Sequence, residues 1–288
     1  MRFASLSDAT KSRALQQAKG PVAILIAEDE AAIAETLHHS RKIGCATLIL
    51  VAPVDLDMPA DLPEDVLRID HKTRGPDITP AIVNPIVAAL PDKTWVYYGY
   101  NAEFLFYPFC ETRTLGEMLA FHTEERRFGM LTYVIDAYAG DLDAAPNAVS
   151  LKDAHFDRSG YYAHARKERD GAKKDRQIDV FGGLRWRFED HIPEPRRRID
   201  RIALVRTEKG LILHDDHTWS DPERNTYACP WHNNLTAAVV SFRAAKALKT
   251  NPASRYDIET FRWHNSAPFE WHSRQLLDLG LIEPGQWF

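Results

Sequence analysis

The chain has 288 residues, 44% of them hydrophobic and 27% charged, a globular composition that at this length buries about 75% of the unfolded surface. Its formal net charge of −5 offers no general positive field, so we expect neither a nucleic-acid partner nor adhesion to an anionic membrane. Three scattered cysteines, Cys45, Cys110 and Cys229, show no metal-type spacing and do not suggest a disulfide framework.

The sequence predicts a single α/β domain over residues 1–288. No Gly/Ser-rich or Pro-rich linker divides it, and no apolar run is long enough for a transmembrane segment. The first twenty residues lack the apolar stretch of a secretory signal. A cytoplasmic location is therefore expected.

The first half of the chain predicts alternating strands and helices. A helix capped by Ser7 or Asp8 and running to residue 19 precedes an apolar, β-branched strand at 22–27. A helix beginning with the acids at 28–30 and ending at Gly44, followed by a buried strand at 46–53, completes a βαβ unit. Such a unit favours a mostly parallel sheet with helices on its faces.

The pattern continues with a strand at 66–70, a helix at 78–90 interrupted by Pro85, and an aromatic strand at 94–100. The tetrad Tyr100-Asn101-Ala102-Glu103 is thereby placed at the carboxyl end of a strand, where open α/β sheets bind their ligands.

The second half predicts an amphipathic helix at 114–127 and a strand at 130–138 that ends near Asp136. Mixed charge at 164–177 indicates a solvated or partly disordered loop, with a mobile lid over a polyanionic ligand as the alternative. The remaining expected elements are short strands at 181–188, 201–207 and 210–216 and a late helix at 233–248.

The order of these segments, with particular residues in them, resembles GT-A glycosyltransferases of the family-2 type, in the bacterial branch that carries a DxDEFL metal motif. The matching residues are Asp29, Glu30, Glu35 and Gly44 in the first unit; Trp95, Val96, Glu103, Phe104, Leu105 and Pro108 around the motif; the strand at 130–138; Gly182, Gly183, Arg185 and Arg187; and the segment 201–217 with its terminal His217.

The resemblance implies a single GT-A-like, Rossmann-like domain that transfers a sugar from a nucleotide-sugar donor to a carbohydrate acceptor. Two departures bear on the metal. The motif aspartates fall on Tyr100 and Ala102, so the tetrad reads as a degenerate motif, and a histidine of the late helix falls on Ser241. Since Mg²⁺ or Mn²⁺ needs oxygen ligands, of which Glu103 and the Asn101 carbonyl alone remain nearby, a divalent cofactor is doubtful and no metal ligand is assigned.

Two functions remain open: a transferase that works without metal, and a catalytically inactive relative that binds a glycan or a nucleotide. For the first, Asp136 is the candidate base and Glu103 the second candidate catalytic residue, each with a structural role as the alternative. The candidate substrate-binding residues are Asp29, Glu30, Tyr100, Asn101, Arg185, Arg187 and His217.

Positive charge at the departing diphosphate is expected from Arg185 and Arg187, at alternate positions of a predicted strand, and from the cluster at 196–198. The alternative is that these are surface residues in ion pairs. His214 and His217 lack the spacing of a helical metal pair. The late tryptophans at 231, 263, 271 and 287 either close the core or stack on sugar rings.

Overall fold

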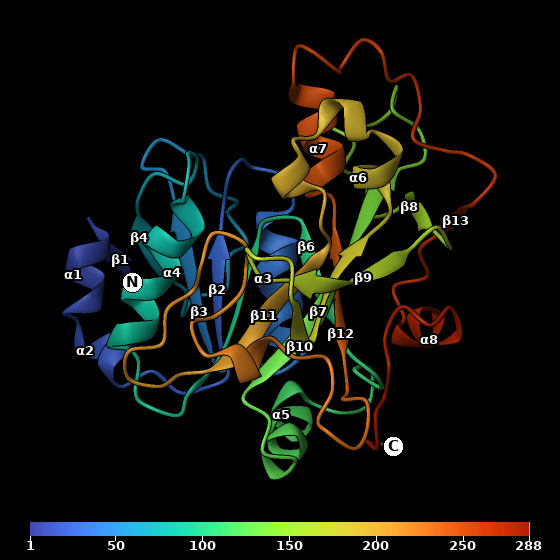
Figure 1. Cartoon of the computed structure of the whole chain (residues 1–288). Helices are drawn as coiled ribbons and strands as arrows, with labels where there is room; N and C mark the ends of the chain where they lie inside the picture. Colours follow the sequence, from blue (N-terminus) through green and yellow to red (C-terminus); the bar gives the residue numbers. More distant parts are fainter. Residues whose placement is uncertain (288) are drawn as a thin grey trace.

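A large mixed, mostly parallel β-sheet with flanking helices forms the frame of the protein, as the sequence predicts (Figure 1). The computed structural model describes residues 1–287. Nine of the sheet's 11 strands lie in one continuous row, in the spatial order β1 (Arg2–Phe3), β4 (Leu67–Asp70), β3 (Thr47–Ala52), β2 (Val22–Ile26), β5 (Trp95–Tyr100), β11 (Asp200–Arg206), β7 (Gly129–Ala139), β12 (Ala237–Ser241) and β6 (Glu103–Phe106).

The rest of the sheet branches from β7, which pairs with β8 (Ala154–Asp157), and β8 pairs in turn with β13 (Ser266–Pro268). A separate two-stranded sheet is formed by β9 (Tyr162–Lys167) and β10 (Lys173–Phe181). Strands β1, β4, β3, β2 and β5 are mutually parallel, and β12 is parallel to β7. Strand β11 runs antiparallel between β5 and β7 and so joins the two halves.

The helices occupy the faces and ends of this sheet. They are α1 (Leu6–Thr10), α2 (Arg13–Gln16), α3 (Ile33–Lys42), α4 (Ile78–Ala89), α5 (Leu115–Glu124), α6 (Leu184–Arg187), α7 (Arg243–Thr250) and α8 (Ser273–Asp278), with 3-10 turns η1 (Glu189–His191), η2 (Glu194–Arg196) and η3 (Pro222–Asn225). Figure 1 shows α6 and α7 beyond one end of the strands and α5 beyond the other.

The central strands have continuous apolar sequences because both of their faces are buried. All residues of β2 and β12 are buried, and β3 and β5 each have one less buried residue, at the start of the strand. Continuous apolar runs of this kind are typical of strands covered on both faces. The predicted βαβ unit is confirmed, as are β4, β5, α5, β7 and the helix α4 with Pro85 inside it.

Two predicted elements near the middle of the chain are wrong. The segment 164–177 is largely part of the β9–β10 hairpin, in which Arg166 is buried and pairs with Asp179 and Asp200. These ion pairs cross between strands, so a search for apolar periodicity cannot detect them. The predicted strand at 181–188 ends at Phe181, and a helical turn, α6, begins after two glycines with positive φ, Gly182 and Gly183.

Three further predictions are corrected. The late helix is a strand followed by a helix: β12 ends at Ser241 and α7 begins at Arg243, because the apolar run before Ser241 fills the sheet between β7 and β6. The N-terminal helix is two short helices, the first capped by Ser5. The segment 210–216 is no strand; its Leu213 makes one isolated bridge, with Trp219.

Candidate functional site

The strand order reverses between β2 and β5, and the polar residues predicted from sequence lie at that point. From β2 the chain proceeds outward to β3 and β4 and then returns to β5 on the other side of β2. Ile26 and Tyr100 are register partners, so the loops that follow them are neighbours. Ligands of open α/β sheets bind at such a switch point, outside the carboxyl ends of the strands.

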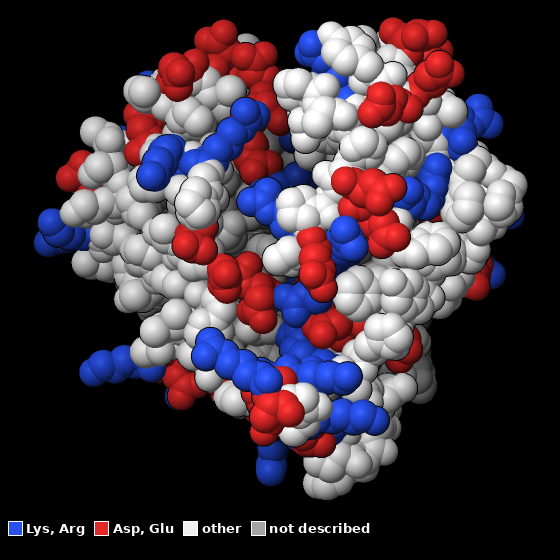
Figure 2. Space-filling view, turned by 45° about the horizontal axis from the view of Figure 1, so that its top comes forward, with Lys and Arg blue, Asp and Glu red and all other residues white. Residues whose placement is uncertain are grey.

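This end of the molecule is turned toward the viewer in Figure 2, which shows a hollow between two lobes with basic and acidic side chains along it. The basic groups that the contacts place here come from three elements and from the segment before β11. They are Arg185 in α6, Arg198 before β11, Arg201 in β11, and Arg243 with Lys246 in α7.

Asn101 organises the loop after β2. Its side-chain oxygen accepts a hydrogen bond from the Glu28 backbone N–H at 2.9 Å, and its amide donates to the Asp29 carboxylate at 2.6 Å and to the Ala31 carbonyl at 2.8 Å. Every polar atom of the Asn101 amide group is therefore engaged in ordering the turn before α3. Asp29 lies in this turn, and Glu30 is exposed.

Tyr100 and Ala102, the positions of the degenerate motif, are buried in the rim. The Tyr100 hydroxyl is hydrogen-bonded to Thr79, and the guanidinium of Arg243 lies 3.7 Å above its ring. A cation over a phenol ring at this distance is held by the ring's quadrupole. Ala102 has φ +58°, and its carbonyl accepts from the Phe242 N–H at 3.0 Å. Tyr100 thus supports an arginine side chain with its ring.

Glu103 forms a buried ion pair with Arg201. The guanidinium donates through Nη1 to Oε2 at 2.6 Å and through Nη2 to Oε1 at 3.0 Å. The carboxylate also accepts from the Ser241 hydroxyl at 2.9 Å and from the Tyr100 N–H at 3.0 Å. Burial opposes the charged form, but Arg201 outweighs it and lowers the pKa of Glu103 to about 2.

These contacts decide whether the tetrad suits a divalent metal. Both oxygens of Glu103 are taken by donors, and the Asn101 oxygen by a backbone N–H. Tyr100 and Ala102 supply no carboxylate. Within residues 1–287, no group of three His, Cys, Asp or Glu side chains is arranged to hold a metal ion. The donor set at the tetrad therefore does not fit Mg²⁺ or Mn²⁺, which require free oxygen ligands.

Arginine side chains lie near His217 instead: Arg201 is 5.9 Å from the centroid of the Tyr98 ring, on which His217 stacks, and Arg198 donates to the Asp216 carbonyl at 3.0 Å. Burial, together with the charges of Arg201, Arg243, Arg185 and Arg198, lowers the pKa of His217 well below its usual range. The imidazole is held by a hydrogen bond at 3.2 Å between its Nδ1 and the Tyr98 hydroxyl, and its ring stacks on that of Tyr98. His217 has φ +63°, a conformation that non-glycine residues adopt mostly where the surrounding structure imposes it.

Two ion pairs connect α7 with the loop after β2. Arg243 contacts both oxygens of Glu28 at 2.7 Å, and Lys246 contacts both oxygens of Asp29 at 3.0 and 2.9 Å. Burial raises the pKa of Asp29, but Lys246 and Asn101 outweigh it, so the net shift is downward. These pairs, which we call the rim clasp, join the N-terminal and C-terminal halves of the sheet at the candidate site.

Asp136 lies within β7, beyond β11 from the switch point, and is the register partner of Ser241, the last residue of β12; the strand does not end there, as the sequence predicted, but continues to Ala139. Its side chain is fully buried, and Oδ2 accepts from the Arg185 N–H and Oδ1 from Arg185 Nε, both at 3.2 Å. Burial raises the pKa of Asp136 to about 6, against the opposing effect of Arg185. Gly183 packs directly on it, since a Cβ at that position would lie 3.1 Å from Oδ2.

Arg187 does not share the environment of Arg185. Because both lie on the turn of α6 and not on a strand, they diverge: Arg187 pairs with Asp157 at 3.1 Å and donates to the Phe261 carbonyl at 2.7 Å. The expectation that the two arginines point the same way on a strand is wrong. Of the cluster at 196–198, Arg198 belongs to the group around His217, whereas Arg197 pairs with the exposed Glu189.

Sequence patterns did not reveal four residues of this site: Glu28, Arg201, Arg243 and Lys246. Arg201 had a weak signal, because it begins the apolar run of β11 directly after Asp200, and a buried charge must find a partner. Arg243 and Lys246 were missed because the segment 233–248 was predicted as one helix and not as β12 followed by α7.

The tryptophans are divided between core and surface. Trp287 is 6% exposed and Trp231 is 83% exposed. Trp271 packs against Phe104 and Phe269, and Trp263 donates to Asp157 at 2.8 Å.

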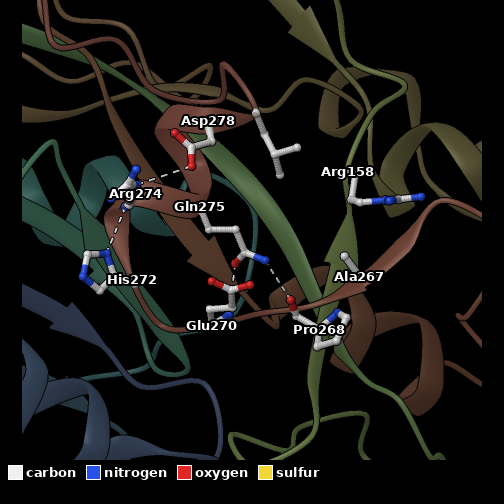
Figure 3. A pocket seen from close by; sticks show the side chains of 9 residues that line it. Arg158, Ala267, Pro268, Glu270, His272, Arg274, Gln275 and Asp278 are labelled. Atoms are coloured by element: carbon white, nitrogen blue, oxygen red, sulfur yellow. Dashed lines mark hydrogen bonds and ion pairs between the residues drawn. The ribbon is translucent and has the colours of Figure 1, made fainter.

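A separate surface pocket of about 630 Å³ lies between β13 and α8 and contains none of the residues predicted from sequence (Figure 3). Its walls are tied together by local contacts: Gln275 donates to the Pro268 carbonyl at 2.9 Å, and Arg274 pairs with Asp278 at 3.6 Å. Since Arg274 is largely exposed, the pocket offers no desolvated charge.

No protein-family model matches this chain, and no curated protein sequence is significantly similar to it. Within residues 1–287 there is no helix with both the length and the apolar character needed to span a membrane.

Proposed function

We propose that this protein is a GT-A-like glycosyltransferase that moves a sugar from a nucleotide-sugar donor to a carbohydrate acceptor, with arginine side chains in place of a divalent metal. The observation that carries the proposal is a cluster of arginines beside the switch point of the sheet. Arg201 and Arg243 lie over the Tyr100 ring, and Arg185 donates to the carbonyl of Arg198, whose guanidinium donates to the Asp216 carbonyl next to His217.

The cluster supplies what the departure of a diphosphate requires. Charge develops on the leaving group in the transition state, and fixed donors in a poorly hydrated site stabilise it most effectively. Guanidinium groups suit phosphate oxygens because they offer several N–H donors in one plane. The ion pairs with Glu28, Glu103 and Asp136 hold the arginines in place before a ligand arrives.

Asp136 fits the role of general base toward an acceptor hydroxyl. A base works best when its pKa lies near the operating pH, and burial brings Asp136 close to that range. Its hydrogen bonds from Arg185 fix the carboxylate, and Gly183, which has no side chain, packs against it. Glu103, locked by Arg201 and Ser241, would act by positioning that arginine and not by touching substrate.

Turnover without metal tests the proposal. Uridine, guanosine and cytidine diphosphate sugars are incubated with the protein in EDTA, with and without a panel of oligosaccharides, and release of the nucleoside diphosphate is measured. We expect release from one donor, no stimulation by Mn²⁺, and a loss of at least 10²-fold in Asp136→Asn. Strict dependence on Mn²⁺ would contradict the arginine cluster as the metal's replacement.

A second function, binding without turnover, is favoured by one observation. Asp136 has no exposed side-chain surface and Arg185 already occupies both of its oxygens. A carboxylate held in this way suits a pseudoenzyme that recognises a nucleotide or a glycan. That function predicts thermal stabilisation by a ligand, about 2.7 kcal/mol at 100 times its dissociation constant, with no nucleoside diphosphate released in the assay above.

A further inference from the structure

A group of exposed and half-buried aromatic rings lies on one face of the β9–β10 hairpin. Tyr162 is the register partner of Phe181, and their rings stack with centroids 5.3 Å apart and an interplanar angle of 19°. His164, two residues further along the same face, has its ring centroid 5.3 Å from that of Tyr162. Tyr162 is 43% exposed.

Trp186 adds a fourth ring nearby. It is 42% exposed, and its Cζ3 would lie 3.8 Å from a Cβ at Gly160, two residues before Tyr162. We call Tyr162, His164, Phe181 and Trp186 the aromatic platform. Large rings that remain exposed together on a protein surface are typical of a binding site.

The platform is continuous with the candidate site on two sides. Phe181 forms an isolated β-bridge with Arg198, a member of the arginine cluster. Gly183, two residues after Phe181, packs on Asp136. The platform therefore adjoins both the proposed anion-binding group and the proposed base.

The platform lies close to the proposed base. A nucleotide is expected at the switch point between β2 and β5, and Asp136 in β7 lies across β11 from that point. Because Gly183, two residues after Phe181, packs on Asp136, a group that stacks on the platform would lie near this carboxylate, where an acceptor hydroxyl is needed.

We propose that the aromatic platform is the acceptor subsite and stacks against a pyranose ring of a neutral oligosaccharide. The C–H face of a pyranose is apolar and matches an aromatic ring, while its hydroxyls can bond the Tyr162 hydroxyl, the His164 imidazole and the Trp186 N–H. This inference rests on the proposed function, since the platform is named as the acceptor side of that same site.

The test measures binding of maltohexaose, cellohexaose, laminarihexaose and chitohexaose by calorimetry and by tryptophan fluorescence, with the full chain and the variants Tyr162→Ala, Trp186→Ala and Tyr162→Phe. At least one hexasaccharide should bind the wild type. Tyr162→Ala and Trp186→Ala should each weaken that binding about tenfold or more, and Tyr162→Phe, which keeps the ring, should retain most of it.

Tyr256→Ala is a matched control, because this ring is 76% exposed and belongs to no part of the platform. The proposal is overturned if none of the four hexasaccharides binds, if the platform variants bind as tightly as the wild type, or if they lose nucleotide binding instead.

Nucleoside diphosphate binding, measured separately on the same variants, distinguishes the two proposals. If only the platform is wrong, a nucleoside diphosphate still binds the wild type and acceptor affinity is indifferent to Tyr162. If the proposed function is wrong, either no nucleoside diphosphate binds or one binds but none is released from a donor in the turnover assay, whatever the hexasaccharides do.

Discussion

Arg201 and Glu103 are the residues whose roles the structure changes most. Glu103 matches a metal-motif position by resemblance, yet its carboxylate is one half of a buried ion pair with side chains that are 2% and 0% exposed. Removing one partner of such a pair strands the other charge in the interior, which costs more than the pair contributes.

We therefore expect Glu103→Gln to lower the free energy of unfolding by about 3 kcal/mol. Because the folded pKa of Glu103 is about 2 and its ordinary value 4.5, the carboxylate stabilises the fold above pH 4.5 and loses this contribution as the pH falls toward 2. The difference between wild type and variant, measured by urea unfolding, should shrink over that range. The exposed ion pair between Arg274 and Asp278 offers a control: Asp278→Asn should change the free energy of unfolding by less than about 0.5 kcal/mol.

The shifted pKa of Asp136 makes stability depend on pH in the opposite direction. Its folded pKa of about 6 exceeds the ordinary 3.8, so the wild type is favoured below pH 3.8 and loses that advantage as the pH rises to about 6. Relative to that of Asp136→Asn, the free energy of unfolding of the wild type should decrease as the pH rises from 3.8 to about 6. In an active enzyme, kcat/KM should rise through the same pH region as the base deprotonates. A stability difference that is flat with pH would contradict the raised pKa.

At the scale of elements, the start of α6 controls the setting of Asp136. Gly183 has φ +63°, and an added Cβ would press on the carboxylate. Gly210 has φ +82°, but a Cβ added there would meet nothing within 4 Å, so this position isolates the cost of the backbone conformation alone.

Gly183→Ala and Gly210→Ala should both lose about 1–3 kcal/mol of stability, because alanine is strained at positive φ. Only Gly183→Ala should also shift the pH dependence of unfolding, or of kcat/KM, that belongs to Asp136. Equal pH profiles for the two variants would show that Gly183 does not control the carboxylate.

Local patterns in the sequence were sufficient for the parallel elements and insufficient for the rest. The strands β2, β3 and β5 are continuous apolar runs, and their burial on both faces follows from that pattern. The hairpin β9–β10 depends on Arg166 reaching Asp179 and Asp200, and α6 on two glycines that end a strand. Such features depend on partners distant in the sequence or on backbone angles, which hydrophobic periodicity does not report.

The whole molecule brings together charges that are far apart in the chain. The rim clasp spans more than two hundred residues, from Glu28 and Asp29 to Arg243 and Lys246, and it forms because β12 lies in the same sheet as β2. The sequence predicted acids after β2, the acid Asp136 near the end of the strand that became β7, and arginines after it. It did not predict that α7 would supply cations to the same rim, because the order of β11, β7 and β12 follows from long-range pairing.

Calorimetric titration of uridine, guanosine and cytidine diphosphates in EDTA and again in Mn²⁺ tests the arginine cluster most directly. We predict that one of them binds equally well in both buffers, and that Arg243→Gln weakens its binding about tenfold or more, because a charge-assisted hydrogen bond is lost. Arg274→Gln, a variant of an arginine with an 81% exposed side chain on α8, should bind as the wild type does. Binding that requires Mn²⁺, binding that is indifferent to Arg243, or no binding of any of the three would contradict the account.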